Sequence, residues 1–321
     1  MPEFSGYLVF NQIDRLRGEV DLDALSSQIP FESKGENSPK EPRRSIREVM
    51  LPARTVDEPV PREFLRVLDE EVRWFKYTLE EFRAEEGIDE DGEISTFYVR
   101  EQIECDIFIT SDGYVFFKGS QSDLQHVVEL FYERLREVGA ADNSRQLEFS
   151  SDFLLWLLYM YNSGDSPPAE VEVDQLTDAR VVGPPNESGG RSNRVSGSTD
   201  VGRSAPILTG ILAGKQISML GGVFTVGGLS LNADIEESGR VHIKSEYDMV
   251  QLESEGRVVS SVTFLRELCN LWEQWRDLPP SEQFPPDEFF EQMYHDLNAA
   301  GVEVQFSLEP IIEEYRQKRG E

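Results

Sequence analysis

A run of nine apolar or aromatic residues, 153–161, lies at the centre of the segment 150–162. Ser150 and Asp152 precede it, and such side chains accept hydrogen bonds from the free N–H groups of a starting helix. The pattern predicts a buried helix in the core between the two halves of the chain, because a helix that is apolar on every face needs partners on every side. Nine residues rise only about 14 Å, roughly half the hydrocarbon thickness of a bilayer, so this helix is too short to cross a membrane. A long core strand is the alternative interpretation.

Apolar residues three and four positions apart predict two amphipathic helices before this segment. Residues 62–86 give the clearest such pattern, and residues 121–138 repeat it. A shorter helix is expected to begin at Asp21 and to be closed by Pro30. The connection 31–61 contains five prolines and is predicted to be extended and mostly irregular.

Strand patterns lie between these predicted helices. We expect strands at residues 7–13, 97–109, 114–118 and 146–149, with a tight turn at 111–113 joining the second to the third. Strand, helix, strand, strand, helix, strand is the order of a ferredoxin-like layer, which we therefore predict for the N-terminal half.

The chain changes character after the central helix. Residues 183–205 are rich in Gly, Ser, Asn and Pro and are predicted to form a loop, and the four glycines within 216–231 predict a twisted sheet with bulges. We expect short strands at 171–173, 179–182, 194–196, 216–231, 241–244, 258–262 and 302–306. We expect helices at 263–276, 285–300 and 310–319.

Together these patterns predict an α+β protein. It has a ferredoxin-like N-terminal layer, a central buried helix, a twisted and mostly antiparallel sheet, and a helical C-terminal tail. The corresponding segments are residues 1–149, 150–162, 163–262 and 263–321.

The charge composition is strongly biased towards carboxylates. The chain carries 61 Asp and Glu against 31 Lys and Arg, a net charge of −30, and only seven of its basic residues are lysines. A hydrated acidic surface with little lysine is typical of proteins kept soluble at molar salt, so we expect a halophilic host. In dilute salt such a charge repels nucleic acid and anionic membranes. At about 1 M salt the Debye length is only about 3 Å, so local clusters of arginine decide whether a phosphate is bound.

The two cysteines, Cys105 and Cys269, fall in a predicted strand and a predicted helix. We recognise no secretory leader within residues 1–10 and no apolar run long enough to span a bilayer. The chain is therefore expected to be cytoplasmic, without a membrane partner, and to have reduced, buried thiols. A disulfide or a shared metal is the alternative interpretation.

No catalytic constellation emerges from the sequence. His126, His242 and His295 are far apart and lack a second ligand at metal-site spacing. Residues 210–216 resemble a phosphate-binding loop but have three residues between the glycines instead of four, and Gln where Mg²⁺ needs Ser or Thr. We therefore expect a protein that is not an enzyme and has no cofactor or metal.

Two basic regions interrupt the acidic composition and are candidate sites for nucleic acid. In the first, four arginines have Glu48 as the single acid between them; in the second, residues 174–216 have a net charge of +1. Guanidinium groups and Gly/Ser backbone N–H groups can hold a phosphate chain if the two regions share a face. Pairing of these cations with neighbouring carboxylates is the alternative. The candidate nucleic-acid-binding residues are Arg43, Arg44, Arg47, Arg54, Arg180, Arg191, Arg194, Arg203 and Lys215.

The order of elements resembles the recombination-associated protein RdgC family. The resemblance rests on the predicted helix 61–86, the hairpin 97–118 with GYVFFKGSQSD, and the later stretches SSDFLLWLLYMYNSG, DQLTDARVVG and ILAGKQISMLGGVFTVGGLSLNADI. It implies a non-enzymatic, nucleoid-associated protein that dimerises into a ring around duplex DNA without reading its sequence. It also implies that such a protein restrains a RecA-type recombinase. No single functional residue is carried over from the family.

Two functions follow as hypotheses. The first is sequence-independent DNA binding by a homodimer, in the form of a ring or clamp that modulates recombination. The second is an acidic protein-interaction subunit of a larger assembly, whose interface is the aromatic and proline-rich tail. Packing of those aromatic residues against the central helix is the alternative for the tail. The candidate interface residues are Trp272, Trp275, Phe284, Phe289, Phe290 and Tyr294.

Overall fold

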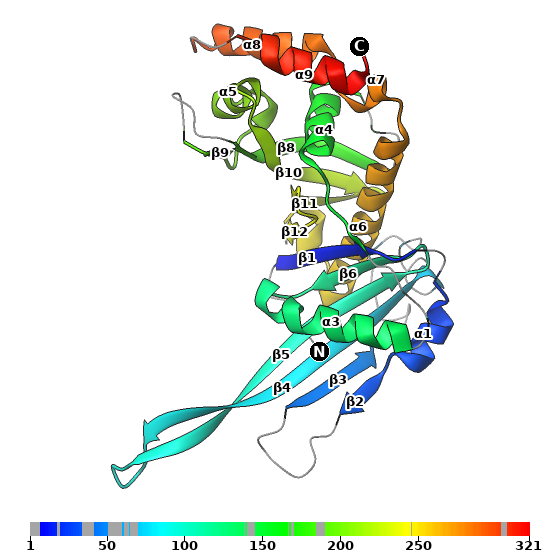
Figure 1. Ribbon diagram of the computed structural model, residues 1–321, viewed down its shortest axis with the longest axis vertical. Coiled ribbons are helices and arrows are strands. Elements are labelled where there is room, and N and C mark those ends of the chain that lie inside the picture. Colours follow the sequence, from blue (N-terminus) through cyan, green and yellow to red (C-terminus); the bar gives the residue numbers. More distant parts are fainter. Residues whose placement is uncertain are drawn as a thin grey trace. The chain divides into compact units, whose positions relative to one another are not determined.

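A computed structural model describes the chain as two compact units (Figure 1). We call residues Val9–Thr55 with Leu65–Gln146 the N-terminal unit, and Met1–Leu8, Val56–Phe64 and Leu147–Glu321 the C-terminal unit. The residues that the structure describes are 7–17, 20–33, 42–50, 60, 64, 70–137, 139, 145–165, 167, 170–183, 190–244, 246–302 and 307–321.

An antiparallel sheet forms the body of the N-terminal unit. Its strands lie in the order β2-β3-β4-β5-β6-β1, and β7 pairs with β1. The strands are β1 (Tyr7–Arg15), β2 (Phe31–Ser33), β3 (Arg43–Glu48), β4 (Val72–Ile88), β5 (Ile94–Thr110), β6 (Tyr114–Lys118) and β7 (Arg145–Gln146).

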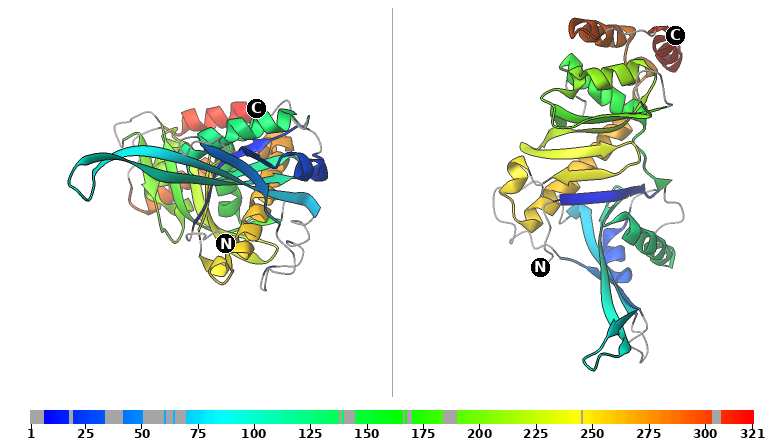
Figure 2. Two further views of the ribbon diagram at one scale, coloured as in Figure 1. Left: turned by 90° about the horizontal axis from the view of Figure 1, so that it is seen from below. Right: turned by 90° about the vertical axis from the view of Figure 1, so that its left-hand side faces the viewer.

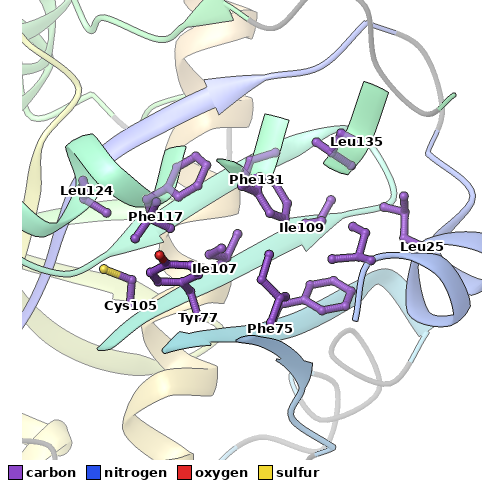
Figure 3. Close-up of a cluster of buried hydrophobic side chains, with 14 of the residues drawn as sticks. Leu25, Phe75, Tyr77, Cys105, Ile107, Ile109, Phe117, Leu124, Phe131 and Leu135 are labelled. Carbon is purple, nitrogen blue, oxygen red and sulfur yellow. The ribbon is translucent and has the colours of Figure 1, made fainter. Parts of the chain in front are cut away.

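The predicted ferredoxin-like order is confirmed within this sheet. The strands β7, β1, β6 and β5 are neighbours in that order, and the helices α1 (Leu22–Gln28) and α3 (Gln121–Glu137) complete the strand-helix-strand-strand-helix-strand unit. Both helices cover one face of the sheet, where Leu25 and Phe131 join a buried cluster with strand residues such as Ile107 (Figure 3). Asp21 caps α1 as predicted, accepting a hydrogen bond from the backbone N–H of Ala24 at 2.9 Å.

The predicted helix 62–86 is wrong over most of its length. Of its described residues, Phe64, Glu70 and Glu71 are helical, but β4 begins at Val72 and pairs with β5 through Ile88. Its apolar residues mislead because many are four apart, and a spacing of four keeps side chains on one face of a strand as well as of a helix. Residues 31–61 also differ from the prediction, since β2 and β3 pair with each other and β3 pairs with β4. These are long-range contacts that a local pattern does not report.

In the C-terminal unit the strands are antiparallel and lie in the order β12-β11-β10-β8-β9. The predicted bulges are confirmed, because the β8–β10 pairing shifts register three times. A Cβ atom at Gly222 would lie 2.0 Å from the carbonyl oxygen of Gln175, so this close approach requires glycine. The strands are β8 (Val171–Val182), β9 (Ser192–Val195), β10 (Gln216–Val226), β11 (Leu229–Glu236) and β12 (Val241–Lys244).

Helices pack against the strands of the C-terminal unit, and most of these helices were predicted. The tail helices are confirmed, but residues 258–262, predicted as a strand, lie inside α6; their apolar side chains are buried within a helix that already begins at Ser254. Of the predicted strand 302–306, residues 303–306 lie outside the described residues and Val302 is not in a strand. The helices are α4 (Ser151–Ser163), α5 (Ala205–Leu212), α6 (Ser254–Asp277), α7 (Pro280–Gln283), α8 (Asp287–Ala299) and α9 (Glu309–Arg319), with 3-10 turns η1 (Val201–Arg203) and η2 (Tyr247–Val250).

The central helix α4 is buried as predicted, and the core to which it belongs is that of the C-terminal unit. Ser150 accepts a hydrogen bond from the backbone N–H of Phe153 at its start, and Gly164 ends it with φ of 72°. Its side chains from Phe153 to Leu158 are buried against β10 and neighbouring helices. None of the described helices has the length and apolar character needed to span a bilayer.

Candidate functional site

The strands β4 and β5 continue as a two-stranded ribbon beyond the rest of their sheet (Figure 1). β3 pairs with β4 only as far as Glu80, and β6 pairs with β5 only from Asp106 onwards. We call residues 81–104 the arm. The views in Figure 2 show it as a twisted ribbon that extends away from its sheet. Among the described residues, no third strand pairs with it. Two-stranded ribbons of this kind are marginally stable in water without further contacts.

A well-ordered turn closes the arm. The carboxylate of Asp89 accepts hydrogen bonds from the Ser95 hydroxyl at 2.6 Å and from the backbone N–H groups of Glu93 and Asp91. The Ser95 hydroxyl makes the largest contribution to lowering the pKa of Asp89 below its usual value. Gly92 supplies the left-handed backbone conformation, with φ of 82°. The turn therefore fixes the register of the two strands.

Apolar side chains gather on the arm although it is exposed. Nine large hydrophobic side chains are exposed in the described part of the chain, and five of them lie here, with exposed fractions from 43% to 78%. Such clustering on a surface marks an interaction site more often than scattered single residues do. The five residues are Ile88, Ile94, Phe97, Tyr98 and Val99.

The two faces of the arm are distinct. Ile88 lies directly opposite Ile94, and Ala84 opposite Tyr98, so these four share one face. Phe97 projects from the other face, where a Cβ atom at Gly87 would lie 3.0 Å from its ring. Gly87 therefore leaves room for the Phe97 ring to lie across the ribbon.

The two edges of the arm differ in charge. On β4, residues 80–86 carry four glutamates and one arginine, and charges of this kind discourage another strand from pairing. On β5, residues 94–99 carry no charge and consist mainly of β-branched and aromatic residues. The unprotected edge is therefore that of β5.

The arm does not follow from the sequence pattern, because residues 62–86, which contain one of its two strands, have the spacing of an amphipathic helix. A usable signal was present in residues 94–99, whose charge-free, β-prone composition follows directly after an acidic turn. This signal identifies an exposed ribbon only if the neighbouring strands β3 and β6 are known to end before the arm begins. Where those strands end is a property of the whole sheet.

Three of the six residues predicted to form a tail interface are buried, which corrects their assignment to an exposed surface. Trp275, Phe289 and Phe290 are buried, while Trp272, Phe284 and Tyr294 are only partly exposed. The alternative, packing against the central helix, is what the structure has. The ring of Phe153 lies 5.4 Å from that of Trp275, and the ring of Tyr159 lies 5.2 Å from that of Phe289. These aromatic side chains form core contacts of the C-terminal unit.

The first group of predicted arginines lies on β3 in the N-terminal unit. Arg43, Arg44 and Arg47 are all exposed, and no ion pair involves them among the described residues. Arg43 and Arg47 share one face of the sheet, whereas Arg44 points to the other. Arg54 lies outside the described residues.

The second group belongs to the C-terminal unit, and its members differ in burial and in ion pairing. Arg180 pairs with Glu236 at 3.3 Å and Arg203 with Asp200 at 3.5 Å, as the ion-pair alternative anticipates. Lys215 is buried, a correction to its proposed role in binding nucleic acid. Its ammonium group donates to the carbonyl oxygen of Gly190 at 2.6 Å and to Asn193 Oδ1 at 2.9 Å. Arg191, Arg194 and Arg203 are the exposed arginines of this group.

Polar side chains also line the strands β11 and β12. Lys244 Nζ lies 2.9 Å from Asp234 Oδ1, and His242 Nδ1 lies 3.8 Å from Asp234 Oδ2. Burial lowers the pKa of His242, although the Asp234 carboxylate acts in the opposite direction. In the part of the chain that the structure describes, no group of three His, Cys, Asp or Glu side chains could hold a metal ion.

Comparison with known proteins gives no further guide to function. The chain matches no protein-family model and no curated protein sequence.

Proposed function

We propose that this chain is a protein-interaction subunit whose arm binds an extended segment of a basic protein along the β5 edge. The observation that supports this most is the concentration of exposed hydrophobic side chains on a ribbon with an uncharged edge. Addition of a strand would pair the free backbone groups of that edge and cover alternate side chains on both faces.

Backbone pairing and apolar burial would supply the affinity. A partner strand along residues 94–99 would cover Phe97 and Val99 on one face and Tyr98 on the other, according to the strand period of two. Burial of one such side chain stabilises by about 1.5–3 kcal/mol. This contribution does not depend on electrostatic attraction, so it persists at high salt.

The charge of the arm favours a basic partner over a second copy of this chain. Nine of the arm's 24 residues are acidic and two are basic, against 61 acidic residues in the whole chain of 321. Two such arms brought together would repel, whereas lysine and arginine on either side of a partner's apolar strand would be attracted. Charge would thus select the partner, and the β5 edge would hold it.

A designed strand peptide tests this proposal. A fluorescently labelled peptide of about nine residues, alternating lysine and valine, should bind the full chain with a saturable rise in anisotropy. Replacing both Phe97→Ser and Val99→Ser should weaken binding by about tenfold or more, because the apolar contacts are lost. A control variant, Val250→Ser, removes a side chain that is 58% exposed in the C-terminal unit and should leave binding unchanged.

Three results would count against the proposal. The same peptide with glutamate in place of lysine should bind much more weakly, so equal binding would remove the charge argument. If the variant Phe97→Ser, Val99→Ser bound the lysine–valine peptide as tightly as the wild type does, the arm would not be the binding site. Sedimentation showing a wild-type dimer that the arm variant dissociates would assign the β5 edge to a second copy instead.

Sequence-independent DNA binding is the second candidate function. It is supported by Arg43, Arg44 and Arg47, exposed on β3 without an ion pair among the described residues. The resemblance to the RdgC family points the same way. A site of three arginines would contact few phosphates, so the dependence of affinity on salt should be shallow.

Anisotropy with a random-sequence duplex and a single strand, at about 0.2 M and about 2 M KCl, tests this candidate over a wide range of screening lengths. Binding should weaken in the triple variant Arg43→Ala, Arg44→Ala, Arg47→Ala. It should persist in Arg83→Ala, an exposed arginine on the arm that pairs with Glu101. If the chain bound no DNA at both KCl concentrations, DNA would be eliminated as the partner of Arg43, Arg44 and Arg47.

A further inference from the structure

A cleft of about 710 Å³ lies within the C-terminal unit, between the end of α4, the turn η1 and the helix α8. Its volume is in the range of small-molecule sites. Aromatic side chains form part of its wall: Tyr159 and Tyr161 from α4, and Phe289 from α8. Tyr159 and Phe289 meet edge to face, with ring centroids 5.2 Å apart.

The charged groups of this cleft are mostly acidic. Asp200, Glu288 and Asp296 line it, against Arg203 as the one cation among the lining residues. The Arg203 side chain is 79% exposed and its Nε atom lies 3.5 Å from Asp200 Oδ2, so this ion pair is weak.

One carboxylate oxygen in the cleft lacks a donor. Asp200 Oδ1 is buried and accepts no hydrogen bond from any described residue. A buried acceptor without a donor costs about 1–3 kcal/mol. The Asp200 side chain as a whole is 35% exposed, so a cation in the cleft can approach its carboxylate from the exposed side and offset part of this cost. The neighbouring phenol of Tyr161 stays neutral, because burial and the Asp200 charge both raise its pKa.

We propose that this cleft binds a small organic ammonium cation. Aromatic rings attract such a cation through their negative faces, and the Asp200 carboxylate supplies the opposite charge. A phosphate or carboxylate ligand is disfavoured, because three acids surround a single exposed arginine. This site is independent of the arm, which belongs to the N-terminal unit.

The test compares choline with its neutral isostere, 3,3-dimethyl-1-butanol, by calorimetric titration of the full chain at constant ionic strength. Choline should bind saturably at millimolar concentration, and the isostere at least about tenfold more weakly, since it lacks the charge that the rings and carboxylate recognise. The variants Asp200→Asn and Tyr159→Leu should each weaken choline binding by about fivefold or more. Glu291→Gln, on an exposed position of α8 that does not line the cleft, should bind as the wild type does.

Several outcomes would overturn the proposal: no saturable binding of choline, equal binding of the isostere, or unchanged binding in both cleft variants. A far-ultraviolet spectrum and an unfolding curve for each variant separate loss of the site from loss of the fold. If Tyr159→Leu unfolds the C-terminal unit, Asp200→Asn decides alone, because it preserves shape and removes only the charge.

Discussion

The thiol of Cys105 lies in the core of the N-terminal unit, under β6 and α3. A Cβ atom at the neighbouring Gly119 would lie 2.6 Å from its sulfur, so the sulfur packs directly against the backbone there. Burial raises the pKa of Cys105 to about 12, and the nearby carboxylates of Asp123 and Asp106 act in the same direction. Both cysteines of the chain are buried, and no disulfide joins them.

We therefore expect the Cys105 thiol to be almost inert in the folded chain. At pH 8 the raised pKa alone reduces the thiolate fraction by about 1,000-fold relative to a thiol with a pKa of 9, and the thiolate is the reactive form. The measurement is the rate of reaction with a disulfide reagent in the variant Cys269→Ala, which keeps Cys105 as its single thiol. The rate should recover fully in denaturant, and rapid reaction of the folded variant would contradict the assigned burial.

A second residue-scale prediction concerns the contact between α9 and the start of α4. Lys318 Nζ lies 2.8 Å from Asp152 Oδ1, and the hydroxyl of Tyr315 donates to the same oxygen at 2.8 Å. Burial alone would lower the pKa of Lys318, but its hydrogen bonds to Asp152 and Glu314 outweigh burial and raise it. The folded state therefore favours the protonated amine, and its contribution to stability is complete below the unfolded pKa of about 10.4.

Lys318→Met should lower the free energy of unfolding by about 2 kcal/mol at neutral pH, the size of a hydrogen bond to a charged group. The difference from wild type should stay constant from pH 7 to about 9.5 and shrink as the pH rises through the folded pKa of Lys318. Lys318→Arg keeps a positive charge at the high pH at which Lys318 loses its proton. Its free energy of unfolding should therefore not fall in that pH range. Denaturant unfolding at each pH gives the comparison, and a difference that grows with pH would contradict the assigned direction.

At the scale of elements, α4 carries the strongest local sequence signal, and its aromatic side chains pack in the core of the C-terminal unit. Phe153 is fully buried and its ring contacts those of Phe149, Trp156 and Trp275. Trp156 is buried too, and its indole N–H donates to the carbonyl oxygen of Glu282 at 3.1 Å. This helix therefore connects the sheet of the C-terminal unit to its terminal helices.

Phe153→Ala should destabilise the chain by about 3–5 kcal/mol, because the lost ring leaves a cavity among side chains that cannot fully collapse. Ser163→Ala, at the exposed end of the same helix, should change stability by less than about 0.5 kcal/mol. Denaturant midpoints of the two variants give the comparison. Similar midpoints would mean that α4 is not packed as the structure has it.

At the scale of the whole molecule, net charge is the dominant feature. A charge of −30 on 321 residues makes the folded state repel itself, and salt relieves this repulsion by shortening the Debye length from about 10 Å at 0.1 M to about 3 Å at 1 M. The thermal midpoint should therefore rise by about 5 °C or more between these KCl concentrations. Thermal melts followed by circular dichroism measure this, and a midpoint that falls with salt would show that surface ion pairs outweigh the repulsion.

Local chemistry in the sequence determined several elements. The Ser150 cap and the apolar run fixed α4, the Asp21 cap and Pro30 fixed α1, and the Ser-Asp-Gly turn placed β5 before β6. Caps, tight turns and helical spacing are readable because each depends on residues close together in the chain. The acidic composition likewise follows from the sequence alone.

Only the tertiary structure decided which apolar residues form strands and which become buried. Residues of β4 four apart fit both a helix and a strand, and pairing with β3 and β5, distant in sequence, selects the strand. The tail aromatics are buried because α4 lies against them, whereas the arm's apolar residues stay exposed because β3 and β6 end before it does. Whether a side chain is buried, or a strand edge exposed, depends on where other segments of the chain end. A short stretch of sequence therefore cannot predict either property.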